Sequence, residues 1–370
     1  MDPELTDDQR LLHDATERFI RAALPLDEVR RLAETGGGPD ASYRKQAAEL
    51  GWFAFLAPDE LGGGGVSGAG LLDAAVLAEL RGRHLQPGGF ADTNAVVATL
   101  ARTGTAQQRA DVLPALVAGE SAAAWALADP TGDWSGPAGV AATPVAGGYR
   151  LSGAKGLVVE PHVADWLLIT AGAPDGPVQF LLPATTRGVR VEVLSGLDLT
   201  RRLGCVRFDD VEVGASAVLG GPAEVEAQLR VACVLAVAET VGAMAQLFEL
   251  SLQYSRDRTA FGRPIGSFQA LKHQLADTSL LLEQSHAVAT GAARAVQAGG
   301  PGAAAAASMA KAFVGDAAVE LAHKSWQIFG GISYTWEHDF HLYLRRLTAD
   351  ASLHGSPSWH RERLCQLVGV

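Results

Sequence analysis

The chain has 370 residues, 48% of them hydrophobic, and a formal net charge of −11. This length and apolar content predict a large buried core, divided between two or three domains. The acidic balance, without a basic stripe, argues against nucleic acid as a partner, and no apolar stretch suits a bilayer span or a signal peptide. Three well-separated cysteines without a C-x-x-C motif make disulfides unlikely, so we expect a reducing, cytoplasmic location.

Residues 1–120 have the pattern of short helices. Thr6-Asp7-Asp8 suits a helix cap, and apolar residues recur at helical spacing after it. We expect helices over Leu5–Leu24, Asp40–Leu50, Gly70–Arg81, Asn94–Thr103 and Ala106–Ala118.

From residue 121 to about 220 the apolar period changes to two, which is typical of strands. Turns rich in glycine and proline separate the segments. The expected strands are Tyr149–Ser152, Gly156–Val159, Trp166–Ala171, Val178–Leu182, Val189–Val193 and Val206–Val211.

Helical periodicity returns from residue 221 to residue 370. The expected helices are Glu226–Arg258, Phe268–Gln297, Ala303–Ile328 and a last one over about Glu337–Leu353. Helices, then strands, then helices indicate three segregated modules rather than alternating βαβ units. We therefore expect domains over 1–120, 121–220 and 221–370.

The corner between the first two of these helices concentrates chemically distinctive residues. It runs Tyr254-Ser-Arg-Asp-Arg258-Thr-Ala-Phe261-Gly262-Arg-Pro264-Ile-Gly266-Ser-Phe268-Gln269. An arginine fork suits a diphosphate, an aromatic edge packs on a ring, and Gln269 can pair with polar groups.

This corner resembles the R-x-x-F-G-(R/K)-x-I-x-x-(F/L)-Q signature of the acyl-CoA dehydrogenase family. Four further family motifs and a subgroup pattern match in register, so the resemblance runs from about residue 5 to 365. They are Pro58-Asp-Glu-Leu-Gly62-Gly63, Ala128-Asp129-Pro130, Gly153-Ala154-Lys155, Asp198-Leu-Thr200-Arg201-Arg202 and Gln327-Ile-Phe-Gly330-Gly331.

The resemblance implies a mainly α fold with a β-barrel insert: an N-terminal helical domain, a middle β-domain and a C-terminal four-helix bundle. It also implies FAD, held between subunits, with an acyl-CoA substrate and an acceptor such as an electron-transferring flavoprotein. One subunit would cradle the flavin ring, and its neighbour would cover the adenine and diphosphate. The neighbour's contacts map onto Arg258, Phe261, Gln269, Gln327, Gly330 and Gly331.

The flavin cradle departs from the family pattern. Ala128 and Val159 replace hydroxyl residues, Leu157 replaces a common tryptophan, and Trp134 stands where serine is usual. Apolar side chains cannot donate to flavin carbonyls, although backbone N–H groups can.

The catalytic base also departs from the pattern. The usual glutamate position falls on His354, and the position used by a minority of relatives falls on Ala232. His354 can accept a proton near neutral pH. Glu239, which interrupts the apolar run Val231–Val241, is the second candidate, because a buried carboxylate can act as a base. Either residue can instead be purely structural.

A metal site is not expected. His338 and His341 lie three residues apart on a predicted helix, but no third ligand follows at metal spacing.

Three functions remain open at this point. The first is an FAD-dependent acyl-CoA dehydrogenase that forms the α,β-enoyl-CoA, with an unusual base. The second is a non-catalytic subunit of an α2β2 assembly, as in steroid-degrading relatives, which completes the FAD site of a homologous chain. The third, a scaffold without flavin, fits least well because the neighbour's contacts survive. A homotetramer is the alternative assembly.

Overall fold

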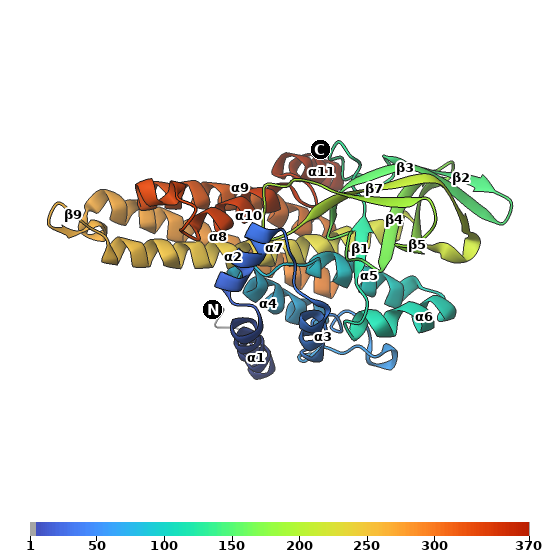
Figure 1. Cartoon of the computed structure of the whole chain (residues 1–370), viewed down its shortest axis with the longest axis horizontal. Coiled ribbons are helices and arrows are strands. Elements are labelled where there is room, and N and C mark those ends of the chain that lie inside the picture. The colour runs from blue at the N-terminus through green and yellow to red at the C-terminus, as the bar shows by residue number, and fades with distance from the viewer. Residues whose placement is uncertain (1–4, 370) are drawn as a thin grey trace.

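The computed structural model describes residues 5–369, in which helices, a sheet and further helices follow one another along the chain (Figure 1). Thr6 caps the first helix in a capping box with Gln9, as its sequence predicts. A helix that the sequence analysis missed starts after Pro25 and stops at Gly36, which adopts the left-handed conformation. The N-terminal helices are α1 (Asp7–Ala23), α2 (Leu26–Thr35), α3 (Ala41–Glu49), α4 (Gly70–Arg83), α5 (Phe90–Thr103) and α6 (Ala106–Val117).

The middle of the chain forms one eight-stranded sheet. Its hydrogen-bonded order is β6-β7-β3-β2-β4-β5-β8, and β1 pairs in parallel with β4. The strands are β1 (Ala123–Ala126), β2 (Val140–Val145), β3 (Gly148–Val159), β4 (Trp166–Ala173), β5 (Gly176–Pro183), β6 (Val189–Val193), β7 (Leu203–Gly214) and β8 (Val218–Gly220). Alternate side chains of these strands enclose an apolar interior of their own.

Strand β3 is continuous where the sequence predicts two short strands. Its register against β7 shifts twice, between Leu151 and Gly153 and between Lys155 and Val158. Such bulges break the alternation of side chains on which a sequence-based assignment depends. Lys155 is the last paired residue before the second shift, and its ammonium donates to the carbonyl oxygens of Leu127, Gly136 and Ala138.

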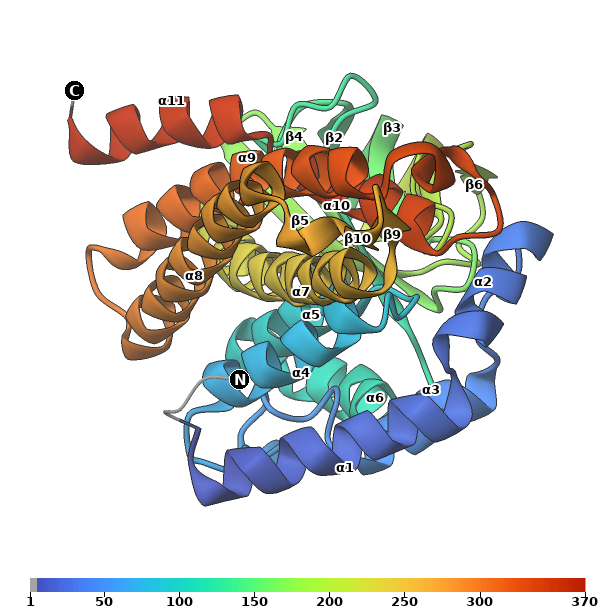
Figure 2. The same cartoon turned by 90° about the vertical axis from the view of Figure 1, so that its left-hand side faces the viewer.

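The C-terminal part is a bundle of long antiparallel helices. They are α7 (Pro222–Asp257), α8 (Gln269–Ala298), α9 (Ala303–Phe329), α10 (Phe340–Ser352) and a final helix that was not predicted, α11 (Pro357–Val368). Helix α7 is apolar and long enough to cross a membrane, but 83% of its most apolar window is buried. It is the central helix of the core, surrounded by α4, α8, α9 and α10 (Figure 2). The expected order of helical, β and helical domains is confirmed.

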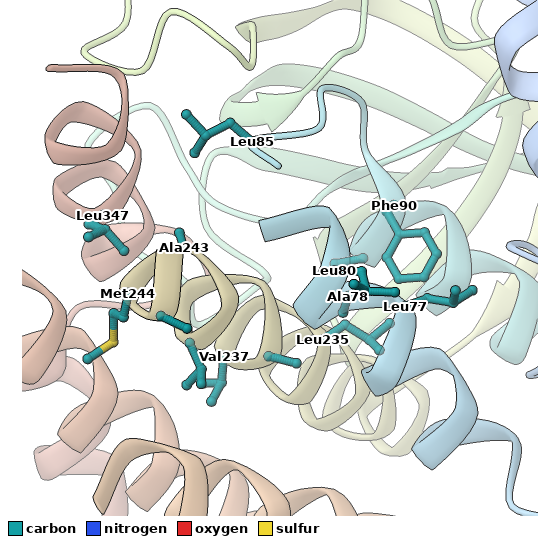
Figure 3. Close-up of a cluster of buried hydrophobic side chains, with 14 of the residues drawn as sticks. Leu77, Ala78, Leu80, Leu85, Phe90, Leu235, Val237, Ala243, Met244 and Leu347 are labelled. Atoms are coloured by element: carbon teal, nitrogen blue, oxygen red, sulfur yellow. The ribbon is translucent and has the colours of Figure 1, made fainter. Parts of the chain in front are cut away.

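Helices α4 and α7 pack unusually closely. A Cβ at Gly82 would lie 1.7 Å from the Glu239 carbonyl oxygen, and one at Gly242 would lie 1.8 Å from that of Glu79. Only glycine permits this backbone approach. Leu77, Leu235 and their neighbours fill the space on either side of the contact (Figure 3). The contact fixes where α7 presents Glu239.

Buried charges tie the segment before β7 to the bundle. Arg346 Nε donates to Asp198 Oδ2 at 2.7 Å, and Arg201 donates to Asp350 Oδ1 at 2.8 Å. The Arg201 guanidinium also lies 3.7 Å from Glu239 Oε2. All of these side chains are at most 6% exposed, so removing one partner would leave a buried charge uncompensated.

Candidate functional site

The arginine corner forms a tight hairpin at the end of α7. Arg258 ends the helix, and short strands β9 (Thr259–Ala260) and β10 (Arg263–Pro264) pair around Phe261-Gly262. Phe261 has a φ of +53° and is 95% exposed. A left-handed conformation and an exposed ring are both costly for phenylalanine, and such features cluster at binding sites. In Figure 1 the hairpin projects beyond the far end of the bundle.

The glycine pair lies at the end of α9. Gly330 has φ +60° and ψ −134°, which a residue with a Cβ rarely adopts. Gly331 has no such backbone requirement, and a Cβ on either glycine would meet no atom within 4 Å. Nothing inside the chain therefore requires a glycine at 331. A group from outside that approaches this turn would require one.

Aromatic and amide contacts hold the corner and the glycine turn at the same end of the bundle. The rings of Tyr254 and Phe329 lie 4.7 Å apart, which joins the last turn of α7 to that of α9. Gln274 Nε2 donates to the Lys324 carbonyl at 2.9 Å, which joins α8 to α9. The polar members of the predicted site are all exposed here, namely Arg258, Gln269 and Gln327. These side chains fit the diphosphate and adenine end of a nucleotide.

His354 lies in the turn between α10 and α11. Its φ is +60°, and its side chain is 3% exposed. Nε2 lies 2.7 Å from Asp92 Oδ1 in the first turn of α5, whereas Nδ1 is buried without a partner. Because the carboxylate accepts, Nε2 carries the proton, and Nδ1 keeps a free lone pair in the neutral ring.

Contacts with α11 fix the turn that carries His354. His360 Nε2 donates to the His354 carbonyl at 2.9 Å. A Cβ at Gly355, whose φ is +108°, would lie 2.7 Å from the Trp359 ring and 2.8 Å from His360 Nε2. Burial lowers the pKa of His360 to about 3, so its ring is neutral at physiological pH.

Two tryptophans cover the His354 ring. Trp134 lies 5.4 Å from it and Trp125 lies 6.4 Å from it, between ring centroids, with Trp125 stacked. The remaining cavity beside His354 measures only about 10 Å³. In this conformation it has no room for a flavin ring and an acyl group together.

Glu239 lines the same small cavity but is already paired. Arg81 Nε donates to its Oε1 at 3.0 Å, and the Arg201 guanidinium lies 3.7 Å from its Oε2. Arg81 in turn lies over the Trp52 and Phe90 rings, at 4.8 and 4.9 Å from their centroids. The structure thus brings both candidate bases to one cavity, with Glu239 held by two cations and His354 by one carboxylate.

The cradle residues lie where β3 approaches the tryptophans. Val159 lines the small cavity, and Leu157 has a φ of +52°. Ala128 is fully buried, and its carbonyl accepts from Gly156 N at 3.0 Å. Ala128, Leu157 and Val159 therefore supply no side-chain donor to this wall.

Sequence reasoning missed Asp92 and Trp125. Asp92 is 262 residues from His354, and no motif surrounds it. The only sequence signal is a carboxylate two residues before the predicted helix Asn94–Thr103. Among residues 5–369 no group of three metal-ligating side chains gathers.

Comparisons with known proteins agree on one family. A model of the acyl-CoA dehydrogenase N-terminal domain matches residues 6–120, and one of the C-terminal domain matches residues 220–367. Acyl-CoA dehydrogenase IpdE2 of Mycobacterium tuberculosis is 31% identical over 340 residues, which cover 91% of this chain and 87% of that protein.

Solved structures resemble the chain over nearly its whole length. The structure described as PigA with FAD and proline has a TM-score of 0.89 and 26% identity, and covers 100% of this chain and 99% of that one. The structure described as a Tcur3481-Tcur3483 steroid ACAD variant has a TM-score of 0.89 and 29% identity, and covers 98% of each chain.

Proposed function

This chain belongs to the acyl-CoA dehydrogenase family, and we propose that it takes part in the α,β-dehydrogenation of an acyl-CoA thioester to the enoyl-CoA. The family's cofactor is FAD, which when bound accepts the hydride that leaves Cβ. The observation that carries this function is the exposed corner at the bundle end, where Arg258, Phe261 and the Gly330-Gly331 turn face outward together.

In this proposal the corner completes a nucleotide site that a neighbouring subunit holds on its other side. Arg258 pairs with a diphosphate, and the Phe261 ring covers an aromatic group. Gln269 and Gln327 supply amide hydrogen bonds, and the glycine turn allows close approach. The polar atoms of the Arg258, Gln269 and Gln327 side chains make no hydrogen bond within residues 5–369, and all three side chains are exposed.

For the proton transfer we favour His354 over Glu239. Asp92 orients the imidazole through Nε2, which leaves the lone pair of Nδ1 to accept the Cα proton as the Cα–Cβ double bond forms. Glu239 is already engaged by two arginines, so its carboxylate oxygens are occupied. Asp92 is in this scheme a positioning residue.

A second function is favoured by the closed centre. The cavity of about 10 Å³, the Trp134 ring over His354 and the apolar cradle suit a subunit that performs no chemistry in its own cleft. Such a subunit would complete the FAD site of a homologous chain in an α2β2 assembly. The paired name Tcur3481-Tcur3483 of the similar steroid ACAD accords with this arrangement. A homotetramer is the corresponding assembly for the first function.

The electron acceptor and the compartment follow from the same scheme. We propose an electron-transferring flavoprotein as the acceptor of reducing equivalents. The three cysteines are free, two of them buried, which accords with a reducing cytoplasm.

One experiment separates the two functions. The chain is purified alone and with a co-expressed homologous chain, and flavin per chain is measured from its absorbance. Straight-chain, branched and ring-containing acyl-CoA thioesters are then tested for bleaching of the flavin. A yellow, reducible chain supports the first function, and then His354→Gln abolishes bleaching whereas Glu239→Gln, matched in size, retains it.

The other outcomes are equally decisive. Colourless protein that becomes active only with the second chain, and stays active with His354→Gln, supports the partner subunit. Loss of bleaching in Glu239→Gln alone, with flavin content unchanged, would overturn the assignment of His354. Absence of flavin and of activity in both preparations would contradict the family function.

A further inference from the structure

A larger cavity lies beside the His354 centre and is not part of it. It measures about 360 Å³ and separates the N-terminal helices from the end of β3. Four aromatic residues dominate its wall: Tyr43, Trp52, Phe53 and Phe90. We call it the aromatic chamber. Its volume falls in the range of small-molecule sites, and an apolar wall favours a compact apolar body.

The aromatic chamber adjoins the small cavity. Both are lined by Gly88, Gly89, Phe90 and Val159, so only this wall separates them. Gly88 has a φ of +97°, and a Cβ on it would meet no atom within 4 Å. A group that extends from the small cavity past this wall would enter the chamber.

Two cations face the aromatic chamber without a full complement of carboxylates. Arg44 donates to the carbonyl oxygens of Gly119 and Glu120, at 2.8 and 3.2 Å, and no carboxylate in residues 5–369 pairs with it. Arg202 Nε is buried without a hydrogen bond and lies 3.6 Å from Glu160 Oε2. Arg202 Nη1 also donates to the Gly36 carbonyl at 3.0 Å, and Glu160 is the buried carboxyl that lines the chamber.

The other charged groups on the wall are already satisfied. Arg81 is paired with Glu239, as described above. Asp40 is exposed, and its Oδ1 accepts from Tyr43 N and Ser42 Oγ at the start of α3. Of the three arginines that line the chamber, Arg44 alone has no carboxylate partner within residues 5–369, and Arg202 keeps an unbonded Nε beside Glu160.

The Arg202 end of the chamber also shows signs of strain and of unused hydrogen-bonding capacity. Glu160 has a φ of +51°, and burial raises the pKa of its carboxyl. Both ring nitrogens of His162, 3.5 Å from Glu160 at the nearest, are buried without a hydrogen bond. Unsatisfied buried polar groups are rare in folded proteins and are commonly completed by a ligand or by water.

We propose that the aromatic chamber binds a compact, largely apolar molecule that carries one carboxylate, and that Arg202 and Arg44 receive the carboxylate. On the proposed function, this molecule is the acyl body of the thioester substrate, with the carboxylate remote from the reacting carbons. The aromatic walls select the apolar body, and the guanidinium groups select the charge, since Arg pairs with carboxylates through two parallel hydrogen bonds.

The test uses free acids, so that it depends on neither flavin nor CoA. Pyrene-1-butyrate and its uncharged amide are titrated into the purified full chain by calorimetry, with energy transfer from tryptophan as a second readout because Trp52 lines the chamber. The acid is expected to bind about tenfold or more tightly than the amide, which is the usual effect of one charge-assisted hydrogen-bond pair.

Matched variants assign that preference to the chamber. Arg202→Gln and Arg44→Gln are each expected to remove most of the acid's advantage while binding of the amide is unchanged. Arg190→Gln, on the exposed face of the sheet, is the control, and it is expected to keep the tighter binding of the acid. Thermal unfolding of all variants shows that they are folded.

Equal binding of acid and amide, or an advantage that survives both variants, would overturn the proposal. Binding that is lost equally in the Arg190→Gln control would do so too. Flavin content tests the proposed function separately. If the acid shows no preference for the chamber, the proposed function still stands. If the chain holds no flavin, the preference of the chamber for the acid can still be measured.

Discussion

At the scale of single residues, His360 supports the candidate centre through the backbone of His354. Its Nε2–H donates to the carbonyl of His354, and so fixes the strained turn that carries the imidazole. The ring is neutral because burial lowers its pKa from 6.5 to about 3. The folded state therefore resists protonation of His360 where the unfolded chain accepts a proton.

This pKa shift predicts a loss of stability in acid. Between pH 6.5 and about 3 the unfolded chain binds one more proton at this site, so the unfolding free energy falls by about 1.4 kcal/mol per pH unit from His360 alone. His84, whose pKa burial lowers to about 4, acts in the same direction. His360→Gln keeps a donor but does not titrate, and is expected to flatten the slope by about one proton in chemical denaturation between pH 6.5 and 5. An unchanged slope would contradict the account of His360.

Sequence alone singled out both candidate bases, because each interrupts a pattern. Glu239 breaks an apolar run, and His354 stands where the family signature has a glutamate. Their partners could not be predicted from sequence. Arg81 and Asp92 lie 158 and 262 residues away from them, and only tertiary packing brings such groups within 3 Å.

At the scale of helices, the contact of α4 with α7 depends on two glycines that allow backbones to touch. Gly242→Ala would place a methyl group 1.8 Å from the Glu79 carbonyl oxygen, so the helices must separate. We expect a loss of about 1–3 kcal/mol or more in unfolding free energy, measured by urea denaturation.

Gly291→Ala on α8 is the matched control. A Cβ there would meet no atom within 4 Å, so the change should raise helix stability by about 0.5–1 kcal/mol. Equal effects of the two substitutions would show that backbone entropy, and not the close helix contact, decides the cost at residue 242.

The long helices followed from the sequence, because apolar periodicity over 27 to 36 residues is a strong signal. The shorter α2 and α11, with 10 and 12 residues, each bury a single residue and were missed. Strand β1, with four consecutive buried residues, lacks the alternation of a half-exposed strand. The sequence pattern therefore located the long helices, and missed two short, largely exposed helices and one short strand that is buried on both faces.

At the scale of the whole molecule, the two halves of the candidate site differ. One end of the bundle exposes an arginine, a ring, two amides and a glycine turn. The centre beside His354 is closed by two tryptophans and leaves about 10 Å³. This difference accords with the proposed contribution of the chain to a nucleotide site across a subunit boundary, whichever subunit supplies the base.

The most direct test of this claim is flavin retention by the assembled protein in which Arg258 is replaced by Gln. Arg256→Gln, two residues earlier and also exposed, is the control. The protein is dialysed against flavin-free buffer, and flavin per chain is then measured. Arg258→Gln is expected to bind FAD about tenfold or more weakly and to lose it on dialysis. Its assembly should stay intact, and the control should keep its flavin. Equal flavin retention by Arg258→Gln and the unmodified protein would contradict the account.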